Sequence, residues 1–593
     1  MQLTGSLFAN MSAVFGNGLS TFPDYPAEIR APKGTVSGVS GFQVHIGNHP
    51  VNTPGDFCDM LVAMNPAALK ANAKWLKRTA LVLVNEDAFD DAGLAKAGFT
   101  GDDPFEELGI ADRTLIVAPI TTLTRKSLAD SGLDNSSIDK CKNMFTLGMA
   151  CYIYSRQLDY VYQYIEGKFS RKHPEMVEPN KKVVTDGYNY AAAIQAVPNT
   201  YTVAPADLPK GTYRNITGNQ AIAWGLMAAA EKAGLPLFCG SYPITPATAI
   251  LEELAIYKGL NVKTMQTEDE IAGICTAIGA AFAGDLAVTT TSGPGLSLKS
   301  EALGLAVMTE LPLVVVDVQR AGPCTGMPTK TEQTDLNEAL YGRNGESPMA
   351  VICAHSPAHC FDAAFLAAKI ALEHMTPVLL LSEGFLGNGS EPWRIPSMAD
   401  YPAITPRYAA APAEGRFQPF LRDAETLARS WAVPGRAGLE HRVGGLEKTH
   451  RGVLSTDPDN HALMVAERAE KVARIAQDIP ALRVNGPASG KLLVVGWGGT
   501  YGHILSAVDE VRAAGKEVSF AHFDFINPLP ANTEEVLSAF AEILVCELNS
   551  GQFADYLRGR CPGHRYVQCN KVQGQTFLVG EVVSAIEQAL KED

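Results

Sequence analysis

Short apolar runs alternate with helical patterns through the middle of the chain, between about residues 215 and 390. The runs lack the alternating polar positions of a strand with one wet face. Strands that are buried on both faces and separated by helices form parallel βαβ units. The sequence therefore predicts a parallel α/β domain here. Its predicted strands are Pro236–Cys239, Leu286–Thr291, Leu313–Val318, Met349–Cys353 and Pro377–Leu381, with a helix over Ala249–Ala255.

Further segments flank this domain, because a chain of 593 residues is too long for one core. The first runs to about residue 195 and has strand-like runs at Thr79–Val84 and Thr114–Ala118. It closes with a helical stretch over Asn143–Glu166. The sequence therefore predicts a second α/β domain at 1–195.

The end of the chain divides into an irregular and a regular part. Residues 391–485 are rich in proline up to Pro434 and poor in β-type runs, which predicts an extended linker region with a helix near Ala462–Ile479. Residues 486–593 alternate again and predict a smaller α/β unit. Its expected elements are strands at Lys491–Gly496, Val518–Phe525 and Ile543–Val545 and a helix near Gly580–Leu590.

Charge and cysteine spacing exclude several classes of protein. The formal net charge is −15, whereas nucleic-acid binding needs clustered lysine and arginine. The sequence has no apolar stretch of about 18 residues that would span a membrane, and its start lacks the basic region of a secretion signal. Its 11 cysteines form no Cys-x-x-Cys pair. We therefore expect a cytoplasmic chain that holds no iron–sulfur cluster.

A turn bracketed by prolines, Tyr242-Pro243-Ile244-Thr245-Pro246, follows the first predicted strand of the central domain. Each proline fixes its own φ and holds the preceding residue extended, so the Thr245 hydroxyl lies on a stiff turn. A stiff hydroxyl at the end of a parallel strand is a common ligand contact. On local physics alone, a proline-rich loop without chemistry is the more frequent interpretation.

Three acids, Glu268, Asp269 and Glu270, precede an almost wholly apolar helical pattern that ends near Gly284. A helix so apolar is buried, and the helix dipole favours carboxylates at its N-terminus. The acids are either ordinary first-turn residues or include one poorly solvated catalytic carboxylate. The pattern leaves both interpretations open.

These two motifs and the two that follow, Ala287–Leu305 and Leu313–Asp335, resemble in sequence and order the thiamine-pyrimidine domain of the 2-oxoacid:ferredoxin oxidoreductases. The run Gly326–Leu336, which reads GMPTKTEQTDL, is most similar to the alpha subunits of the 2-oxoglutarate enzymes. The resemblance implies that residues 215–390 bind the pyrimidine of thiamine diphosphate.

The resemblance extends to both ends of the chain. The runs Asp24–Lys33, Leu147–Ile153 and Lys168–Lys182 are similar to the family's gamma subunit, here fused ahead of alpha. Residues 486–593 resemble a transketolase C-terminal domain. The implied fold is multi-domain α/β, with a gamma-type domain at 1–195, the parallel-sheet pyrimidine domain at 215–390, the linker at 391–485 and the transketolase-like domain at 486–593.

The resemblance also implies roles for individual residues. Thiamine diphosphate is activated when a carboxylate bonded to its pyrimidine N1′ favours the imino form, and the family pattern assigns this to Glu270, with Glu268 as the alternative. Arg320 is implied to bind the substrate carboxylate, or else to form a salt bridge with Asp317 or Asp335. Thr245, Glu270 and Arg320 are the expected catalytic residues. The expected cofactor contacts are Tyr242, Pro243, Ile244, Thr245, Glu270, Ser292 and Gly293.

A dicarboxylate substrate would need a second cation, and the sequence offers three. Arg343 is favoured because flanking glycines open space beside it, and Lys299 and Lys330 are the alternatives. Each of the three is more often an ordinary surface charge. With Thr245 and Arg320 they form the expected substrate-binding set.

The activity that the resemblance implies is oxidative decarboxylation of 2-oxoglutarate with coenzyme A, which gives succinyl-CoA, CO2 and reduced ferredoxin and is reversible in principle. The alternatives are the same chemistry on pyruvate or a branched 2-oxoacid, or an assembly subunit without catalytic contacts. The chain lacks the family's acidic magnesium motif, so we expect no metal ligands in it. A beta subunit is expected to supply the diphosphate and Mg2+ site and a [4Fe–4S] cluster, to reduce ferredoxin, and to form an (alpha–beta)2 heterotetramer.

Overall fold

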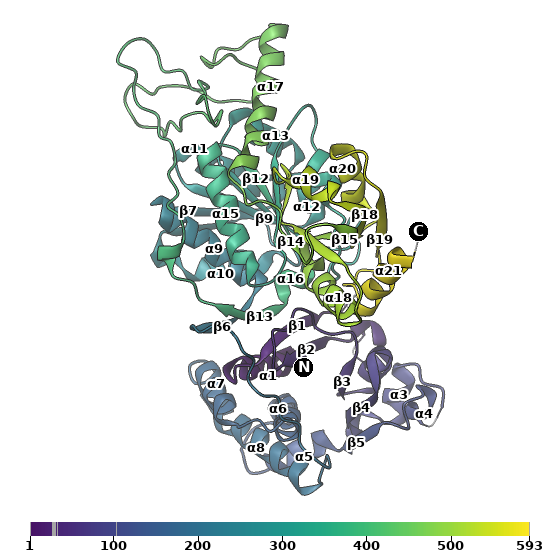
Figure 1. The fold of residues 1–593 in the computed structure, drawn as a ribbon. Coiled ribbons are helices and arrows are strands. Elements are labelled where there is room, and N and C mark those ends of the chain that lie inside the picture. The colour runs from purple at the N-terminus through teal and green to yellow at the C-terminus, as the bar shows by residue number, and fades with distance from the viewer. Residues whose placement is uncertain (1, 27–30, 33, 102, 592–593) are drawn as a thin grey trace. The chain divides into compact units, whose positions relative to one another are not determined.

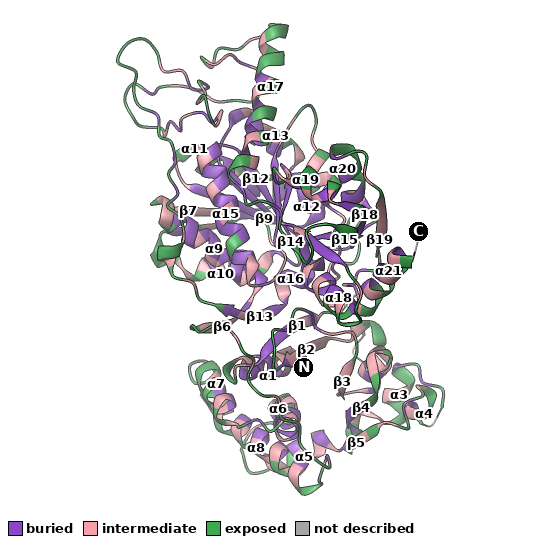
Figure 2. Cartoon of the chain, in the orientation of Figure 1, coloured by how far each residue is buried: buried purple, intermediate pink, exposed green. Residues whose placement is uncertain are grey.

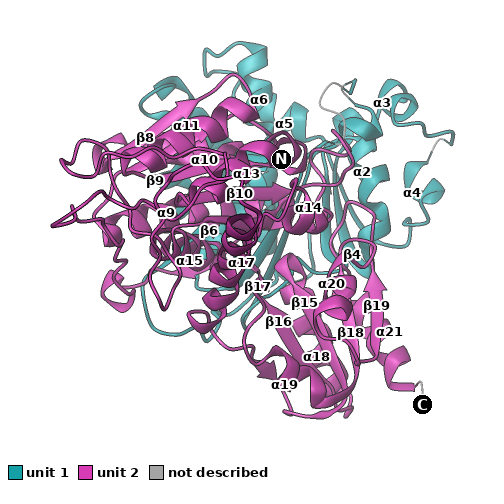
Figure 3. Ribbon diagram, turned by 90° about the horizontal axis from the view of Figure 1, so that it is seen from above, with its two compact units in different colours: residues 1–215 teal, residues 216–593 magenta. Residues whose placement is uncertain are grey.

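The computed structural model describes residues 2–26, 31–32, 34–101 and 103–591. The chain forms two compact units, residues 1–215 and 216–593, which Figure 3 colours separately. Part of the predicted gamma-like run Asp24–Lys33 lies outside the described residues. The predicted segment boundaries are finer than this division and stay predictions.

Unit 1 contains a parallel sheet of three strands in the order β3-β4-β5 and a separate antiparallel pair, β1 and β2. The strands are β1 (Gly18–Asp24), β2 (Gly41–Gly47), β3 (Cys58–Ala63), β4 (Leu76–Asn85) and β5 (Thr114–Ala118). β4 is buried from Ala80 onward because its apolar run is covered on both faces. The strands predicted at Thr79–Val84 and Thr114–Ala118 are thereby confirmed.

The helices of unit 1 include a close pair, α6 and α8. The helices are α1 (Gln2–Val14), α2 (Pro66–Asn72), α3 (Asp91–Lys96), α4 (Pro104–Glu107), α5 (Ile120–Ser127), α6 (Asn135–Ile153), α7 (Asp159–Phe169) and α8 (Val177–Ala193). A Cβ on Gly148 would lie 2.0 Å from the Val184 carbonyl oxygen, and one on Gly187 would lie 2.1 Å from that of Phe145. The two helix backbones therefore meet at glycines because no side chain fits between them.

The helical stretch predicted over Asn143–Glu166 consists of two helices. Helix α6 ends at Ile153 and α7 begins at Asp159. Between them Ser155 has a φ of 52°, in the left-handed region that a continuing helix excludes. The Arg156 amide then donates to the Cys151 carbonyl at 2.7 Å, which closes the end of α6.

Seven strands form the central sheet of unit 2 (Figure 1). They are β7 (Leu237–Ser241), β8 (Val262–Gln266), β9 (Leu286–Thr291), β10 (Leu313–Gln319), β11 (Ala350–Cys353), β12 (Pro377–Glu383) and β17 (Phe525–Asn527). Their order is β17-β11-β12-β10-β9-β7-β8, and all pairs are parallel except β11 with β17. Figure 2 shows β9 and β12 buried along their length. The predicted parallel domain and its five strands are confirmed.

Two strands of this sheet were not expected. β8 is an edge strand with three exposed residues among five, so it lacks the apolar run that marks the others. β17 belongs to the C-terminal part of the chain and joins the sheet through Val351, opposite Asn527, and Ile352, opposite Phe525. Its pairing is long-range and leaves no local signal.

Helices connect and cover the strands of the central sheet. They are α9 (Gly218–Ala233), α10 (Thr248–Ile256), α11 (Glu270–Ala283), α12 (Gly293–Leu298), α13 (Ser300–Thr309), α14 (Leu336–Tyr341), α15 (His359–His374) and α16 (Gly384–Asn388). Helices α9 and α15 approach closely at Gly225, where a Cβ would lie 2.2 Å from the Phe361 carbonyl oxygen. Strand β6 (Tyr213–Thr217) carries the chain from unit 1 into unit 2, and β13 (Ser390–Arg394) follows α16.

Five strands form a second sheet in unit 2, in the order β14-β16-β15-β18-β19. They are β14 (Val484–Asn485), β15 (Gly490–Trp497), β16 (Ser519–Phe523), β18 (Phe540–Glu547) and β19 (Tyr566–Asn570), with helices α18 (Tyr501–Ala513), α19 (Thr533–Ser538), α20 (Gln552–Arg560) and α21 (Val579–Lys591). All pairs are parallel except β14 with β16. The α/β pattern predicted for residues 486–593 is confirmed.

The proline-rich segment before helix α17 (Pro458–Arg474) is irregular but anchored. Trp431 is fully buried and donates from Nε1 to the Ala281 carbonyl at 3.1 Å. Arg422 and Lys471 bind the buried Glu310 carboxylate at 2.6 and 2.7 Å. Burial alone would raise the pKa of Glu310, but Lys471 and Arg422 lower it to about 2. Buried charge pairs thus hold the segment to the part of unit 2 that is predicted to bind the pyrimidine.

Among the described residues, every helix is too short or too polar to cross a lipid bilayer.

Candidate active site

The carboxyl ends of three neighbouring strands lie along one edge of the central sheet. β7 pairs with β9, and β9 pairs with β10, all in parallel. Tyr242 follows β7, Ser292 follows β9 and Arg320 follows β10. Ligands of open parallel sheets bind at this edge. The segments singled out in the sequence therefore converge on the place where a ligand is expected.

Glu270 is the buried member of the three acids. Asp269 caps helix α11 by accepting a hydrogen bond from the Ala272 amide at 2.7 Å. This leaves Glu270 as the first helical residue, only 8% exposed, whereas Glu268 is exposed. No described residue donates a hydrogen bond to the Glu270 carboxylate. Burial without a partner makes Glu270, rather than Glu268, the carboxylate available to a ligand.

A glycine and a lysine fix the position of Glu270. A Cβ on Gly295 would lie 2.8 Å from Glu270 Cγ and 2.1 Å from Thr291 Oγ1, so only glycine lets α12 approach α11 this closely. Lys299 is fully buried and donates from Nζ to the Glu270 carbonyl oxygen at 2.8 Å. Burial lowers the pKa of Lys299 to about 8, and the charge of Glu270 opposes that shift. Lys299 thus holds the backbone beneath the candidate catalytic acid.

Thr245 and Arg320 meet across the strand ends. Arg320 Nη1 donates to the Thr245 carbonyl oxygen at 2.8 Å, while the Thr245 residue itself is exposed. Arg320 is 7% exposed, and its Nε has no partner among the described residues. Burial lowers the pKa of Arg320, and the charges of Asp335 and Asp317 oppose this. A guanidinium with an unused donor beside an exposed threonine is suited to bind a carboxylate.

The other predicted cofactor contacts surround this pair. Tyr242 is 38% exposed, and Pro243 and Ile244 are half-buried on the same turn. Ser292 is fully buried, and its Oγ has no partner among the described residues. Gly293 begins α12 and is followed by Pro294. These roles stay predictions, but the Ser292 hydroxyl is a buried polar group that a bound cofactor could satisfy.

Two buried carboxyls, Asp317 and Asp335, lie beneath Arg320. Asp317 is fully buried on β10, and Asp335 is 9% exposed. No other described donor reaches either Asp317 oxygen, and the two carboxyls face each other. Burial raises the pKa of Asp317 well above its ordinary value and that of Asp335 to about 7. Burial therefore favours a proton on this pair of carboxyls. A Cβ on Gly293 would lie 2.6 Å from Asp335 Oδ1, so glycine is required there.

Asp335→Asn should make stability less dependent on pH. The native carboxyl holds its proton up to about pH 7, whereas the unfolded one loses it near 3.8. The wild-type chain therefore loses free energy of unfolding as pH rises from about 4 to about 7. Asparagine does not titrate, so the free energy of unfolding of the variant should rise relative to wild type across this range, by on the order of 2–4 kcal/mol. Melting temperatures measured at several pH values check this.

The control for this prediction is Asp555→Asn, which changes an exposed aspartate that is paired with Arg558 at 2.6 Å. It should leave the pH profile as in wild type. Parallel profiles for Asp335→Asn and wild type would contradict a raised pKa at Asp335.

The three candidates for the second cation lie in different settings. Arg343 donates to the carbonyls of Ser347, Ala339 and Leu340 at 2.9–3.1 Å. Its role in binding a distal carboxylate stays a prediction, and it would require some of these bonds to be exchanged. Lys299 is committed to the Glu270 backbone, and Lys330 is half-buried in the loop after Arg320. Of these three candidates, Lys299 is the one that interacts electrostatically with both Glu270 and Asp317.

Sequence reasoning missed that the buried carboxyls of Asp317 and Asp335 lie together. Both residues appear only as alternative partners of Arg320, yet no salt bridge joins them to it among the described residues. The available signal was an aspartate in the middle of the apolar run Leu313–Val318, where an unpaired charge is too costly to bury.

Comparisons with known proteins identify relatives of this chain. A family model described as "Pyruvate flavodoxin/ferredoxin oxidoreductase, thiamine diP-bdg" matches residues 229–454, and one described as "Pyruvate ferredoxin/flavodoxin oxidoreductase" matches residues 1–190. The 2-oxoglutarate oxidoreductase subunit KorA of Mycobacterium tuberculosis is 49% identical over 100% of this chain and 90% of its own length. The 2-oxoglutarate synthase subunit KorA of Methanothermobacter marburgensis is 31% identical over 63% of this chain and 97% of its own length.

A solved structure shares the fold. The 2-oxoglutarate:ferredoxin oxidoreductase from Magnetococcus marinus, with 2-oxoglutarate, coenzyme A and succinyl-CoA bound, has a TM-score of 0.85 at 26% identity. The alignment covers 99% of this chain and 97% of that chain. The fold is thus that of a thiamine-diphosphate-binding oxidoreductase subunit. More particularly, the chain belongs to the 2-oxoglutarate:ferredoxin oxidoreductase family as an alpha-type subunit, which confirms the predicted resemblance and fold class.

Proposed function

We propose that this chain is the alpha-type subunit, with a gamma-type domain fused in front, of a 2-oxoglutarate:ferredoxin oxidoreductase. The reaction is the decarboxylation of 2-oxoglutarate with coenzyme A, giving succinyl-CoA and CO2 while ferredoxin is reduced; it can in principle run as a carboxylation. The observation that carries the proposal is 49% identity to a 2-oxoglutarate oxidoreductase subunit over the whole chain. The convergence of Glu270, Thr245 and Arg320 at one sheet edge supports it.

The residues at the sheet edge fit thiamine diphosphate. When bound, this cofactor supplies the nucleophilic carbon that cleaves the bond between C1 and C2 of a 2-oxoacid. Glu270 would accept a hydrogen bond from the pyrimidine, because its buried carboxylate has no competing partner among the described residues. Ser292 Oγ would find in the cofactor the partner that it lacks within the described parts of the chain. Arg320 would orient the substrate through the C1 carboxylate, with the Thr245 hydroxyl beside it.

A partner chain is proposed on the exposed side of Glu270. Two apolar side chains close to Glu270 in the chain are exposed: Met265 is 47% exposed and Ile271 46%. Apolar side chains gathered near a buried catalytic acid suit a subunit interface better than water. We therefore infer that a beta subunit covers this surface and supplies the diphosphate and Mg2+ site, within an (alpha–beta)2 heterotetramer.

Electrons from the reaction must leave through the partner. We infer that the beta subunit carries a [4Fe–4S] cluster and reduces ferredoxin. All 11 cysteines of this chain are free thiols, and most are buried singly. Free thiols persist in a reducing compartment, so we place the enzyme in the cytoplasm.

The purified chain alone should show no iron–sulfur absorption, because its cysteines lack the clustered spacing of a cluster site. Iron and sulfide assays of the chain and of the co-purified complex check this. We expect both elements in the complex only. Stoichiometric iron and sulfide in the isolated chain would contradict the assignment of the cluster to the partner.

Binding of thiamine diphosphate separates a catalytic subunit from a mere assembly chain. We expect the complex to bind thiamine diphosphate with Mg2+ by calorimetry, and Glu270→Ala in this chain to weaken that binding by at least about tenfold, since a hydrogen bond to a charged group contributes roughly 1.5–3 kcal/mol. The control is Glu268→Ala, which removes the exposed neighbour. Equal affinity in wild type and Glu270→Ala would favour an assembly role without cofactor contact.

A further inference from the structure

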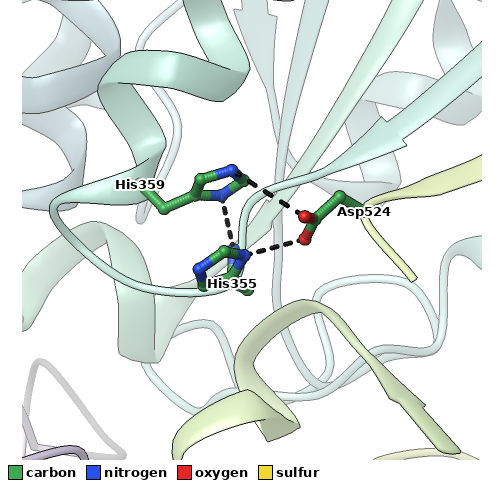
Figure 4. Close-up of side chains that lie close together, drawn as sticks. All are labelled: His355, His359 and Asp524. Carbon is green, nitrogen blue, oxygen red and sulfur yellow. Dashed lines mark hydrogen bonds and ion pairs between the residues drawn. The ribbon is translucent and has the colours of Figure 1, made fainter. Parts of the chain in front are cut away.

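Two histidines and an aspartate meet at a second place on the carboxyl edge of the central sheet (Figure 4). His355 follows β11, His359 begins α15, and Asp524 lies between β16 and β17. β11 is separated by β12 from β10, the strand that leads to Arg320. The cluster is therefore distinct from the candidate active site, and both of its sides belong to unit 2.

The two imidazole rings stack face to face, with centroids 3.7 Å apart and planes at 13°, beside the Asp524 carboxylate. His355 Nδ1 lies 2.8 Å from Asp524 Oδ1, and His359 Nε2 lies 4.0 Å from Asp524 Oδ2. One ring nitrogen or carboxylate oxygen from each residue lies within 4.8 Å of the others. Atoms bound to Zn2+ at about 2.0–2.2 Å in a tetrahedron are roughly 3.3–3.6 Å apart. The observed separations bracket that value, and turning one ring out of the stack would let both nitrogens face a shared ion.

A third histidine, His522, lies beside the cluster. The side chain of His522 is 6% exposed, and its Nε2 lies 3.9 Å from Asp524 Oδ1. Neither ring nitrogen of His522 has a well-aligned hydrogen-bond partner among the described residues. A buried imidazole of this kind can offer a lone pair to a ligand.

The loop that carries the two histidine ligands is itself held rigidly. Ser356 Oγ and the Ala358 amide both donate to the half-buried Glu391 carboxylate, at 2.5 and 2.6 Å. The His355 amide donates to His359 Nδ1 at 3.3 Å, which puts the ring proton of the neutral imidazole on Nε2. Metal binding through His359 Nε2 therefore breaks this long hydrogen bond and moves the proton to Nδ1. Hydrogen bonds that hold the loop carrying the ligands are characteristic of metal sites.

We propose that His355, His359 and Asp524 bind a divalent transition-metal ion, Zn2+ fitting best, and that His522 is the fourth ligand. Three imidazoles and one carboxylate select zinc or its neighbours over Mg2+ or Ca2+, which prefer oxygen. The spacing His355-x-x-x-His359 is that of the histidine pair in many zinc sites. The metal takes the place of the proton between His355 Nδ1 and Asp524 Oδ1, and that proton passes to solvent.

The site would fasten the C-terminal α/β part to the central sheet. His355 and His359 belong to the central part, whereas His522 and Asp524 flank the end of β16 and the start of β17. The two parts already meet there, since the Cys353 amide donates to the Asp524 carbonyl oxygen at 2.7 Å. A metal ion that binds the folded state alone would stabilise this junction. The proposal does not depend on the reaction that the enzyme performs.

Zinc binding to the complex tests the proposal. The complex is stripped with a chelator, dialysed and titrated with Zn2+ against a chromophoric competitor, and bound zinc is counted by mass spectrometry. We expect about one zinc per chain, and binding weakened by at least about tenfold in His359→Gln and in Asp524→Asn. The matched control is His461→Gln, which removes an exposed histidine with a similar carboxylate contact, 2.8 Å from Glu447. It should bind zinc as wild type does.

Two results would overturn the proposal. One is wild-type complex that retains well under one zinc per chain. The other is tight zinc that survives unchanged in both His359→Gln and Asp524→Asn, since that zinc would be bound elsewhere. If either variant fails to fold, the cobalt(II)-loaded wild type decides: ligand-field bands of a four-coordinate site with nitrogen and oxygen ligands support the assignment, and the spectrum of hydrated cobalt contradicts it.

Discussion

Glu270→Gln should lower the turnover of the enzyme complex by at least about a hundredfold, the scale of lost proton-transfer assistance. The two side chains are nearly equal in size, so the start of α11 and the hydrogen bond from Lys299 Nζ to the residue 270 carbonyl should persist. What changes is the charge that favours the reactive form of the cofactor. Steady-state assays of the complex with saturating thiamine diphosphate measure the effect.

Glu268→Gln is the control for this prediction, because Glu268 is exposed two residues away and carries the same charge. It should retain near-normal turnover. The reverse pattern, with Glu268→Gln inactive and Glu270→Gln active, would transfer the role to Glu268 and contradict the argument from burial.

Arg320→Ala should weaken the apparent binding of every 2-oxoacid by about one to two decades, since a hydrogen bond to a charged group contributes roughly 1.5–3 kcal/mol. All 2-oxoacids share the C1 carboxylate, so the loss should not discriminate between 2-oxoglutarate and pyruvate. The ratio of kcat/KM for the two substrates, measured in wild type and variant, checks this. Arg320→Lys should recover only part of the loss because ammonium lacks the planar fork of guanidinium.

Arg343→Ala tests whether Arg343 binds the distal carboxylate, which 2-oxoglutarate has and pyruvate lacks. If Arg343 binds the distal carboxylate, the variant should lose activity on 2-oxoglutarate and keep it on pyruvate. Equal loss of activity on both acids would indicate that Arg343 has a structural role. Its three hydrogen bonds to backbone carbonyls are consistent with such a role. Lys299 and Lys330 would then be the next residues to replace.

The central sheet could be predicted because its strands are locally distinctive. Leu313–Gln319 is buried at every position, and a short apolar run between helical patterns is typical of a strand covered on both faces. The choice of Glu270 over Glu268 came from the family resemblance, because the local pattern left both acids open; the structure shows Glu270 buried at the start of α11 and Glu268 exposed. Local pattern was sufficient wherever burial was dictated by neighbours in the chain.

Contacts between distant residues could not be predicted. Asp317 and Asp335 come together only because the loop after β10 folds back over that strand. His355 and Asp524 meet only because β17 crosses to pair with β11. Helix α6 stops before Ser155, whose left-handed backbone conformation is not indicated by the helix propensity of serine. In each case a tertiary contact, rather than a sequence pattern, decides the structure.

The substrate preference of the complex tests its assignment to 2-oxoglutarate. The co-purified complex is supplied with thiamine diphosphate, Mg2+, coenzyme A and oxidised ferredoxin, and each of 2-oxoglutarate, pyruvate and a branched 2-oxoacid is offered in turn. We expect 2-oxoglutarate to give the highest kcat/KM, with succinyl-CoA, CO2 and reduced ferredoxin as products that all require thiamine diphosphate. A clear preference for pyruvate, or product formation that does not need thiamine diphosphate, would contradict that assignment.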